Sequence, residues 1–224
     1  MTEFLLALFV FLFAHILPQI GDLRGKIISL TNRKTYIIGY SILSTVLLVW
    51  LISAALRAPK TVYYAADPTT VRIAMGLMLV AVILFVMGAM RPNSLSVSFR
   101  RNIDMENKKP GILTLVRHPI IVAFGLWAFA HIIVNGELAN ILLFGIMLAF
   151  SVLGMLRLNK TKATKLSAAA YQQALQKEAG SFGQRLRRAL DGQFWIELVI
   201  GAVLYMAILH AHGAVIGVDP LAYF

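Results

Sequence analysis

Long apolar stretches alternate along the chain with shorter basic ones. The apolar runs lie at about residues 4–20, 36–56, 71–90, 120–134, 138–156 and 195–212. Most of them approach the ~20 apolar residues that a membrane-spanning helix needs. The pattern therefore predicts an all-α, polytopic membrane bundle of about six transmembrane helices. We expect residues 1–224 to form a single transmembrane domain, because each polar interval is short compared with a soluble domain.

The fourth apolar run is the exception in length. Its fifteen residues, 120–134, would rise only ~22 Å as a helix at ~1.5 Å per residue, whereas the hydrocarbon core of a bilayer is ~30 Å thick. Either this helix begins before Pro119, or protein rather than lipid surrounds it.

The composition is typical of a membrane protein, and the positions of its basic residues predict which side of the membrane each loop faces. The chain is 59% hydrophobic and 14% charged, whereas a soluble domain is about 45–50% apolar and about 25% charged. The net charge of +11 would suggest nucleic-acid binding in a soluble protein. Here, however, 18 of the 21 Lys and Arg residues fall in the loops 21–35, 91–118 and 157–194 or at their edges. Basic residues gather in cytosolic loops, so we predict these loops in the cytosol and both termini on the other side.

Histidines are the candidate ligands, because the chain has no cysteine and therefore no disulfide, thiolate metal site or cysteine nucleophile. His15 and His131 lie inside predicted spans, where ionisable groups are costly and usually functional. Two neutral imidazoles from different helices suit a bis-histidine haem site but are too few for a closed zinc site. The alternative is that each imidazole only hydrogen-bonds to a neighbouring helix.

The depths of the histidines leave their pairing open. His15 lies about five residues from the cytosolic end of its span, with Gln19 one turn later as a possible hydrogen-bond partner. His131 lies about twelve residues from the cytosolic end of its own span, or ~18 Å. His118 matches His15 better in depth.

The triplet Arg117-His118-Pro119 marks a predicted helix start, since proline is favoured at the first helical position. Two potential cations at the positive end of a helix are unfavourable, and a bound anion would relieve this. A haem propionate, a cofactor carboxylate or a lipid phosphate would serve. The alternative is a cytosolic interface anchor. We expect Glu197, His210 and His212 to be interface residues without a chemical role.

Several strings now resemble the NnrU family of membrane proteins. They are Pro110-Gly111-Ile112, Arg117-His118-Pro119, residues 126–131 (LWAFAH), residues 135–139 (NGELA), residues 143–145 (LFG), residues 91–96 (RPNSLS), His15, and the Gly201, Tyr205, His212 and Gly217-Val218 positions near the end. The resemblance covers essentially the whole chain. It implies a multi-pass protein of the bacterial inner membrane, linked to nitrite and nitric oxide reduction.

The same resemblance implies a cofactor. A plant relative of the family, the 15-cis-zeta-carotene isomerase, holds haem b and isomerises a cis double bond when the iron is reduced. Its proposed histidine ligands fall on His15 and His131 here, and its alternative cysteine ligand falls on Ala128. The resemblance thus implies haem b ligated by His15 and His131, with Arg117 and His118 contacting a propionate. The expected reaction is redox-gated cis–trans isomerisation of a lipophilic polyene, with the bilayer and a lipophilic small molecule as partners.

Two other hypotheses remain open. The Arg117-His118-Pro119 triplet is also similar to that of the isoprenylcysteine carboxyl methyltransferases, where it helps to hold S-adenosylmethionine. Those enzymes usually follow it with an acidic pair, but residues 160–171 contain no Asp or Glu. The third hypothesis is a non-catalytic accessory protein of a nitrogen-oxide reductase, which needs no cofactor.

Overall fold

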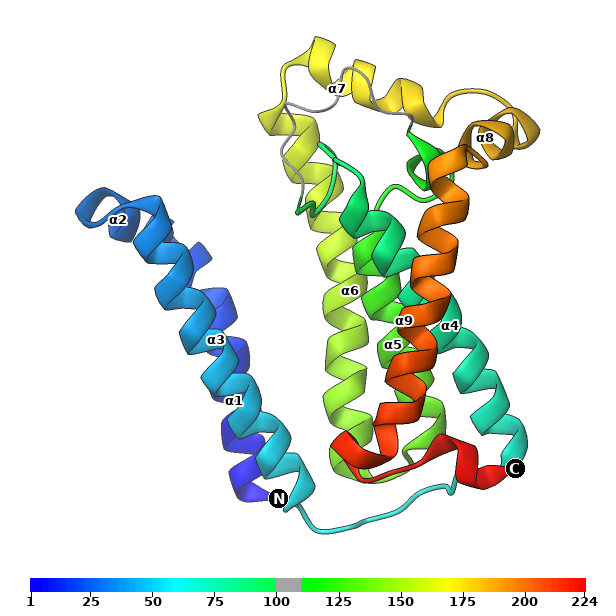
Figure 1. Ribbon diagram of the computed structural model, residues 1–224. Helices are drawn as coiled ribbons and strands as arrows, with labels where there is room; N and C mark the ends of the chain where they lie inside the picture. Colours follow the sequence, from blue (N-terminus) through cyan, green and yellow to red (C-terminus); the bar gives the residue numbers. More distant parts are fainter. Residues whose placement is uncertain (100–109) are drawn as a thin grey trace. The chain divides into compact units, whose positions relative to one another are not determined.

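The computed structural model describes residues 1–99 and 110–224, without the side chains of Gln19 and Lys165. The described part is 80% helical and contains no β-strand, only an isolated bridge between Val62 and Glu137 (Figure 1). The predicted all-α fold is therefore confirmed. Part of the predicted basic loop 91–118, residues 100–109, lies outside the described residues, as does the side chain of Gln19 that was expected beside His15.

The helices follow one another with short connections. Short 3-10 helices are labelled η. In chain order the elements are α1 (Thr2–Ile16), η1 (Leu17–Asp22), α2 (Leu23–Leu30), α3 (Arg33–Leu56), α4 (Pro68–Met90), η3 (Gly111–Thr114), α5 (Pro119–Val134), α6 (Leu138–Lys165), α7 (Ala168–Leu175), η4 (Gln176–Glu178), α8 (Phe182–Ala189), α9 (Gly192–Ile216) and η5 (Pro220–Tyr223).

Four described helices, α3, α4, α6 and α9, are long and apolar enough to cross a membrane. A fifth candidate is the pair formed by α1 and residues 20–30, which is bent by 70°. The remaining apolar run is α5, with 16 residues. It begins at Pro119 and not earlier, and residues along its length are buried, which favours the explanation that protein surrounds it. The chain is thus a helical membrane protein.

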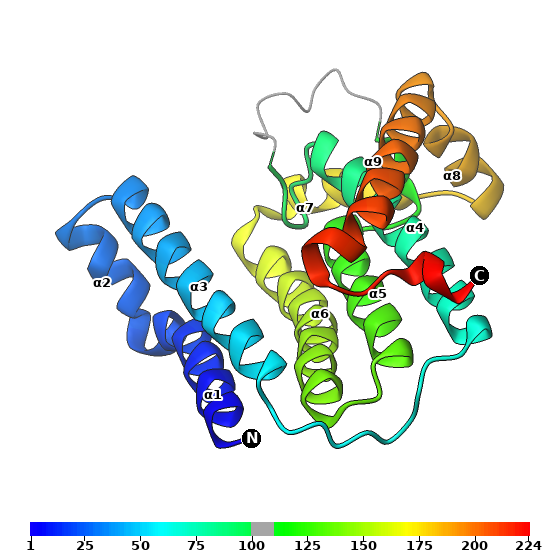
Figure 2. The ribbon, with the colours of Figure 1, turned by 60° about the horizontal axis from the view of Figure 1, so that its bottom comes forward.

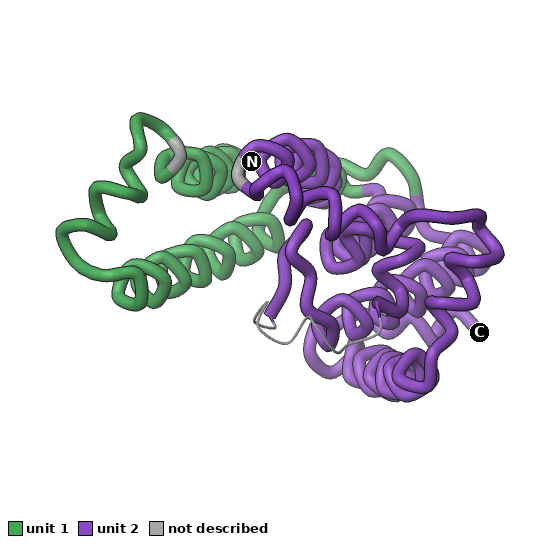
Figure 3. Tube along the Cα trace, turned by 90° about the horizontal axis from the view of Figure 1, so that it is seen from above, with its two compact units in different colours: residues 1–64, 137–143 green, residues 65–136, 144–224 purple. Residues whose placement is uncertain are grey.

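The chain divides into two compact units, residues 1–64 with 137–143 and residues 65–136 with 144–224 (Figure 3), and each is described by itself. In the first unit α1 packs on α3. The buried residues of α1 are spaced three and four apart and so share one helix face; they are Phe4, Ala7, Leu8 and Phe11. At one end Glu3 pairs with Arg57 at 2.6 Å.

In the second unit, α4 packs against both α5 and α9. Gly88, near the end of α4, lies against the Pro119 and Ile120 side chains at the start of α5. Arg91, just after α4, binds Asp191, which caps the start of α9. Both α5 and α9 therefore begin beside the C-terminal end of α4. They run antiparallel to α4 and in the same direction as each other (Figures 1 and 2).

The contact between α4 and α9 depends on a close approach at Gly201. A Cβ atom at this position would lie 2.8 Å from the backbone Cα of Ile83, so a side chain there has to push the helices apart. Small residues allow such approaches in membrane bundles. We expect Gly201→Ala to lower the free energy of unfolding by about 1–3 kcal/mol through overpacking.

Thermal unfolding in detergent measures this effect, with Gly76→Ala as the matched control. Gly76 lies inside α4, and a Cβ atom there meets nothing within 4 Å, so the control should be neutral or stabilising. Equal unfolding temperatures for the Gly201→Ala variant and the unmodified protein would contradict the packing argument.

Candidate functional site

His131 lies one turn before the end of α5 and is fixed in one tautomer. Its Nδ1 lies 2.8 Å from the backbone oxygen of Trp127. A carbonyl oxygen only accepts hydrogen bonds, so Nδ1 carries the proton and Nε2 keeps a lone pair. Two aromatic rings pack on the imidazole, with centroid distances of 5.2 Å to Trp127 and 4.8 Å to Phe144. The His131 imidazole therefore lies among aromatic rings and has the lone pair of Nε2 available to bind a ligand.

His15, in α1 of the first unit, shows the same arrangement. Its Nδ1 lies 2.7 Å from the backbone oxygen of Phe11, again one turn earlier. Nε2 accepts a hydrogen bond from the Ser44 hydroxyl of α3 at 3.1 Å. The Tyr40 ring stands edge-on at 5.8 Å. His15 therefore also presents Nε2 as its acceptor nitrogen, and it holds a hydrogen bond there.

Arg117 and His118 share one acceptor on α6. The Asn159 side-chain oxygen accepts from Arg117 Nη1 and from His118 Nε2, both at 3.0 Å. The arginine has only donors, so the amide oxygen must face it, and His118 must donate from Nε2. The buried Nδ1 of His118 is then an acceptor without a hydrogen-bond partner among the described residues. Burial lowers the pKa of His118 below its ordinary value, which keeps this imidazole neutral.

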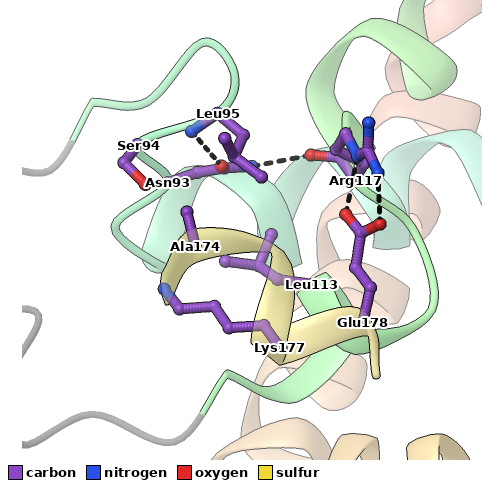
Figure 4. A pocket seen from close by; sticks show the side chains of 8 residues that line it. All are labelled: Asn93, Ser94, Leu95, Leu113, Arg117, Ala174, Lys177 and Glu178. Atoms are coloured by element: carbon purple, nitrogen blue, oxygen red, sulfur yellow. Dashed lines mark hydrogen bonds and ion pairs between the residues drawn. The ribbon is translucent and has the colours of Figure 1, made fainter. Parts of the chain in front are cut away.

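The charge of Arg117 is neutralised from within the chain. Its Nε and Nη2 form a bidentate pair with Glu178 of η4, at 2.7 and 2.5 Å, and the hydrogen bonds to Glu178 raise the pKa of Arg117. Asn93 donates to the Arg117 backbone oxygen at 2.8 Å (Figure 4). The cavity lined by these residues measures about 10 Å³, which is room for about one water molecule. A propionate or other ligand would have to displace Glu178, and its binding here stays a prediction.

We expect Asn159→Ala to lower the free energy of unfolding by about 1–3 kcal/mol, because it leaves the donors of Arg117 and His118 without their acceptor. The matched control is Asn140→Ala on the same helix, since no hydrogen bond is made by the Asn140 side chain in the described part of the chain. Chemical unfolding in detergent compares the two variants. A loss no greater than that of the control would count against a structural role for this hydrogen-bond pair.

Within the second unit, His118 and His131 do not lie together. Thirteen residues separate His118 from His131, which is ~20 Å along a helix, so they occupy opposite ends of α5. His15 belongs to the other unit. In the described residues, no three His, Asp or Glu side chains gather as metal ligands.

An ion cluster that the sequence did not predict ties α4 to α9. Arg91 donates from Nη1 and Nη2 to Asp191, both at 2.8 Å, and from Nε to Glu197 at 2.8 and 2.9 Å. Gln193 donates to Glu197 at 2.7 Å. The expectation that Glu197 is an interface residue is wrong, because this side chain is 0% exposed. Gly111 adopts a positive φ of 51° directly against the Arg91 guanidinium, where a Cβ atom has no space.

Beside these polar clusters, the second unit contains an apolar groove of about 550 Å³ between α4, α5, α6 and α9. Such a volume is typical of small-molecule sites, which range over ~300–1,000 Å³. The Ser151 hydroxyl in its lining donates to the Ile121 backbone oxygen at 2.7 Å and so already has a hydrogen-bond partner within the unit. Trp127 lines the groove and also bonds His131 through its backbone oxygen.

A family model described as NnrU protein matches residues 3–220. The chain belongs to the NnrU family. No curated protein and no solved structure matches it. The resemblance seen in the sequence is therefore confirmed, and the match includes parts of both units of this NnrU protein. It also includes the four predicted site residues, the Arg91 cluster and the groove.

Proposed function

We propose that this NnrU-family membrane protein binds haem b and that neutral imidazoles of His131 and His15 ligate its iron. The observation that carries the proposal is the shared tautomer of the two histidines. Each is in an apolar helix, and each donates Nδ1–H to the backbone carbonyl one turn earlier. Histidine ligands of metals are commonly oriented in this way, with the second nitrogen left to bind the metal.

The residues around these imidazoles fit such a group. The chain has no cysteine, so imidazole is the strongest haem ligand that it offers. The Trp127 and Phe144 rings both pack on the His131 ring. Haem b would supply the redox chemistry, while the protein supplies ligation, orientation and a dry setting.

We further propose that the protein acts on a lipophilic polyene, by cis–trans isomerisation gated by the redox state of the cofactor. The apolar groove supports this proposal, because it is lined by membrane helices and reaches Trp127, the residue that positions His131. The family resemblance also supports a link to nitrite and nitric oxide reduction. We also propose a bacterial inner-membrane location, which the family resemblance supports. The distribution of Lys and Arg supports an orientation with the basic loops in the cytosol and both termini outside it.

The test is the visible spectrum of the protein purified in mild detergent, in the oxidised state and after reduction with dithionite. We expect a Soret band and, on reduction, the sharp α and β bands of low-spin haem. A preparation that stays colourless when haem is supplied during expression rejects the proposal. Binding of S-adenosylmethionine in a calorimetric titration would then favour the methyltransferase hypothesis, and recovery of a reductase subunit in a pull-down would favour the accessory one.

A further inference from the structure

A glycine of α6 leaves open space in the apolar groove of the second unit. Gly154 lines the groove together with Phe150 and Ser151 of the same helix. At 3.6 residues per turn, a side chain at position 154 would point between these two, ~40° from the first and ~60° from the second. A Cβ atom placed there nevertheless meets nothing within 4 Å beyond the backbone of its own helix. The space that a side chain would fill is therefore part of the groove.

This open space lies on the inner face of α6. Leu143 and Met147 are buried, and they precede Gly154 by 11 and 7 residues, so the three positions share one helix face. Gly145 precedes Gly154 by nine residues, which is about two and a half turns, and so lies on the opposite face. A Cβ atom at Gly145 also meets nothing within 4 Å, but that position does not line the groove.

Other glycines on inner faces of this unit have packing partners. A Cβ atom at Gly125 of α5 would lie 2.6 Å from the Ser151 hydroxyl oxygen, and one at Gly201 of α9 would lie 2.8 Å from the Cα of Ile83. Small residues at such positions let helices approach each other. Gly154 has no neighbour of this kind, although glycine weakens a helix relative to alanine. Close helix packing therefore does not explain Gly154, whereas the open space beside it does.

The wall of the groove on α5 is aromatic and flat. The Phe124 and Trp127 rings both line the groove and stack with a centroid distance of 5.2 Å and an interplanar angle of 24°. Phe144 packs edge-on against Trp127 at 5.3 Å and so supports its ring. Aromatic faces favour stacking with other planar π systems. Since none of the described lining residues is charged, the groove suits a neutral, planar and apolar group.

The groove extends along α5 and α6 from Gly154 to Trp127. The two helices are antiparallel (Figures 1 and 2), and the hydrogen bond from Ser151 to the Ile121 backbone oxygen places these two residues at the same height. Gly154 lies three residues beyond Ser151 toward the start of α5, and Trp127 lies six residues beyond Ile121 toward its end. The two ends are thus separated by ~14 Å along the helix axes. A linear chain of this length would contact both.

We propose that Gly154 determines which lipophilic molecules the groove accepts, because it leaves the space in which a linear conjugated hydrocarbon chain lies. This inference rests on the proposed action on a lipophilic polyene and adds the residue that controls the choice of that molecule. A larger side chain at this position would fill the space and exclude the chain without disturbing a helix contact. A saturated lipid chain has no π system to stack on Phe124 and Trp127, so the conjugated chain is the preferred occupant.

The experiment titrates the full-length protein, in mild detergent, with the achiral polyene diphenylhexatriene and records the circular dichroism of the polyene. An achiral chromophore gives no such signal in a detergent micelle and acquires one when a protein holds it. The variant is Gly154→Leu, and the matched control is Gly145→Leu on the opposite face of the same helix. We expect a saturable signal from the unmodified protein and the control. In Gly154→Leu the apparent affinity should fall at least about tenfold through overpacking.

Equal affinities of folded Gly154→Leu and the control would overturn the role of Gly154. Absence of the signal from the unmodified protein, or its loss when saturated phospholipid is added in equal amount, would overturn the conjugated chain as the occupant. If Gly154→Leu aggregates on size-exclusion chromatography, the flexible side chain of Gly154→Met fills the same space and decides in its place. The Soret band of the same preparations reports haem independently, so haem binding without a polyene signal rejects this inference alone. A polyene signal that depends on Gly154, in protein without haem, supports it and rejects the haem proposal.

Discussion

Replacing His131 with alanine is expected to remove the Soret band of the purified protein. In the ligand pair proposed above, His131 is one of the two residues that would bind the iron. Even the outer partners of metal ligands typically contribute 10–100-fold to metal affinity, so loss of the ligand itself should reduce haem content by more than about tenfold. The ratio of Soret to protein absorbance after purification measures this content.

The control is His210→Ala, which removes an exposed imidazole of the same kind from α9 and should keep its haem. Size-exclusion chromatography establishes whether each variant is still folded. A Soret band of normal intensity and position in folded His131→Ala protein would exclude His131 as a ligand. Any haem still bound would then be ligated by other residues.

The membrane fold was predictable because hydropathy acts locally. The free energy of transferring an apolar run from water to lipid depends on the residues of that run alone, so a span can be recognised without knowing its contacts. The ends of the helices were less predictable. The span predicted at 138–156 extends as α6 to Lys165, because residues 157–164 contain no Gly or Pro and continue the helix beyond the apolar part. Hydropathy marks the apolar part of a span, whereas the ends of the helix are determined by its backbone hydrogen bonds.

The first span, predicted at 4–20, differs in the other direction, because its helix is shorter than the apolar run. Its helix ends at Ile16, because Pro18 disfavours a continuing α-helix at the residue before it. Gly21 and Asp22 then adopt left-handed conformations, and the chain bends by 70° into the next helical segment.

The candidate site was predictable only in part. His15 and His131 were evident because an ionisable side chain in an apolar run is conspicuous by itself. The partners of Arg117 and Arg91 were not, since Glu178 follows Arg117 by 61 residues and Asp191 follows Arg91 by 100. No local spacing links such pairs. One signal was present for the Arg91 cluster, namely an acidic residue, Glu197, in the second turn of an otherwise apolar helix. Such a residue needs a cation when it is buried.

Removal of the Arg91 side chain is expected to produce the largest loss of stability in the molecule. The Arg91 and Asp191 side chains are 2% and 5% exposed, and that of Glu197 is 0% exposed. Arg91→Met would leave two carboxylates buried beside each other without their guanidinium. Removing one partner of a buried ion pair typically costs about 3–5 kcal/mol. The matched control is Arg57→Met, which breaks a pair whose side chains are about half exposed and should cost much less, because solvent screens an exposed pair.

A second variant distinguishes the loss of charge balance from the loss of packing. In the triple variant Arg91→Met, Asp191→Asn, Glu197→Leu, no uncompensated charge remains in the cluster, and asparagine keeps the cap of α9, which Asp191 provides through the Phe194 amide. Replacement of a buried ion cluster by apolar groups of similar volume is often neutral or stabilising. Equilibrium unfolding in detergent should therefore find the triple variant more stable than Arg91→Met alone. If both are equally unstable, Arg91 contributes through its packing on Gly111, and the charge balance of the cluster is not what holds α4 to α9.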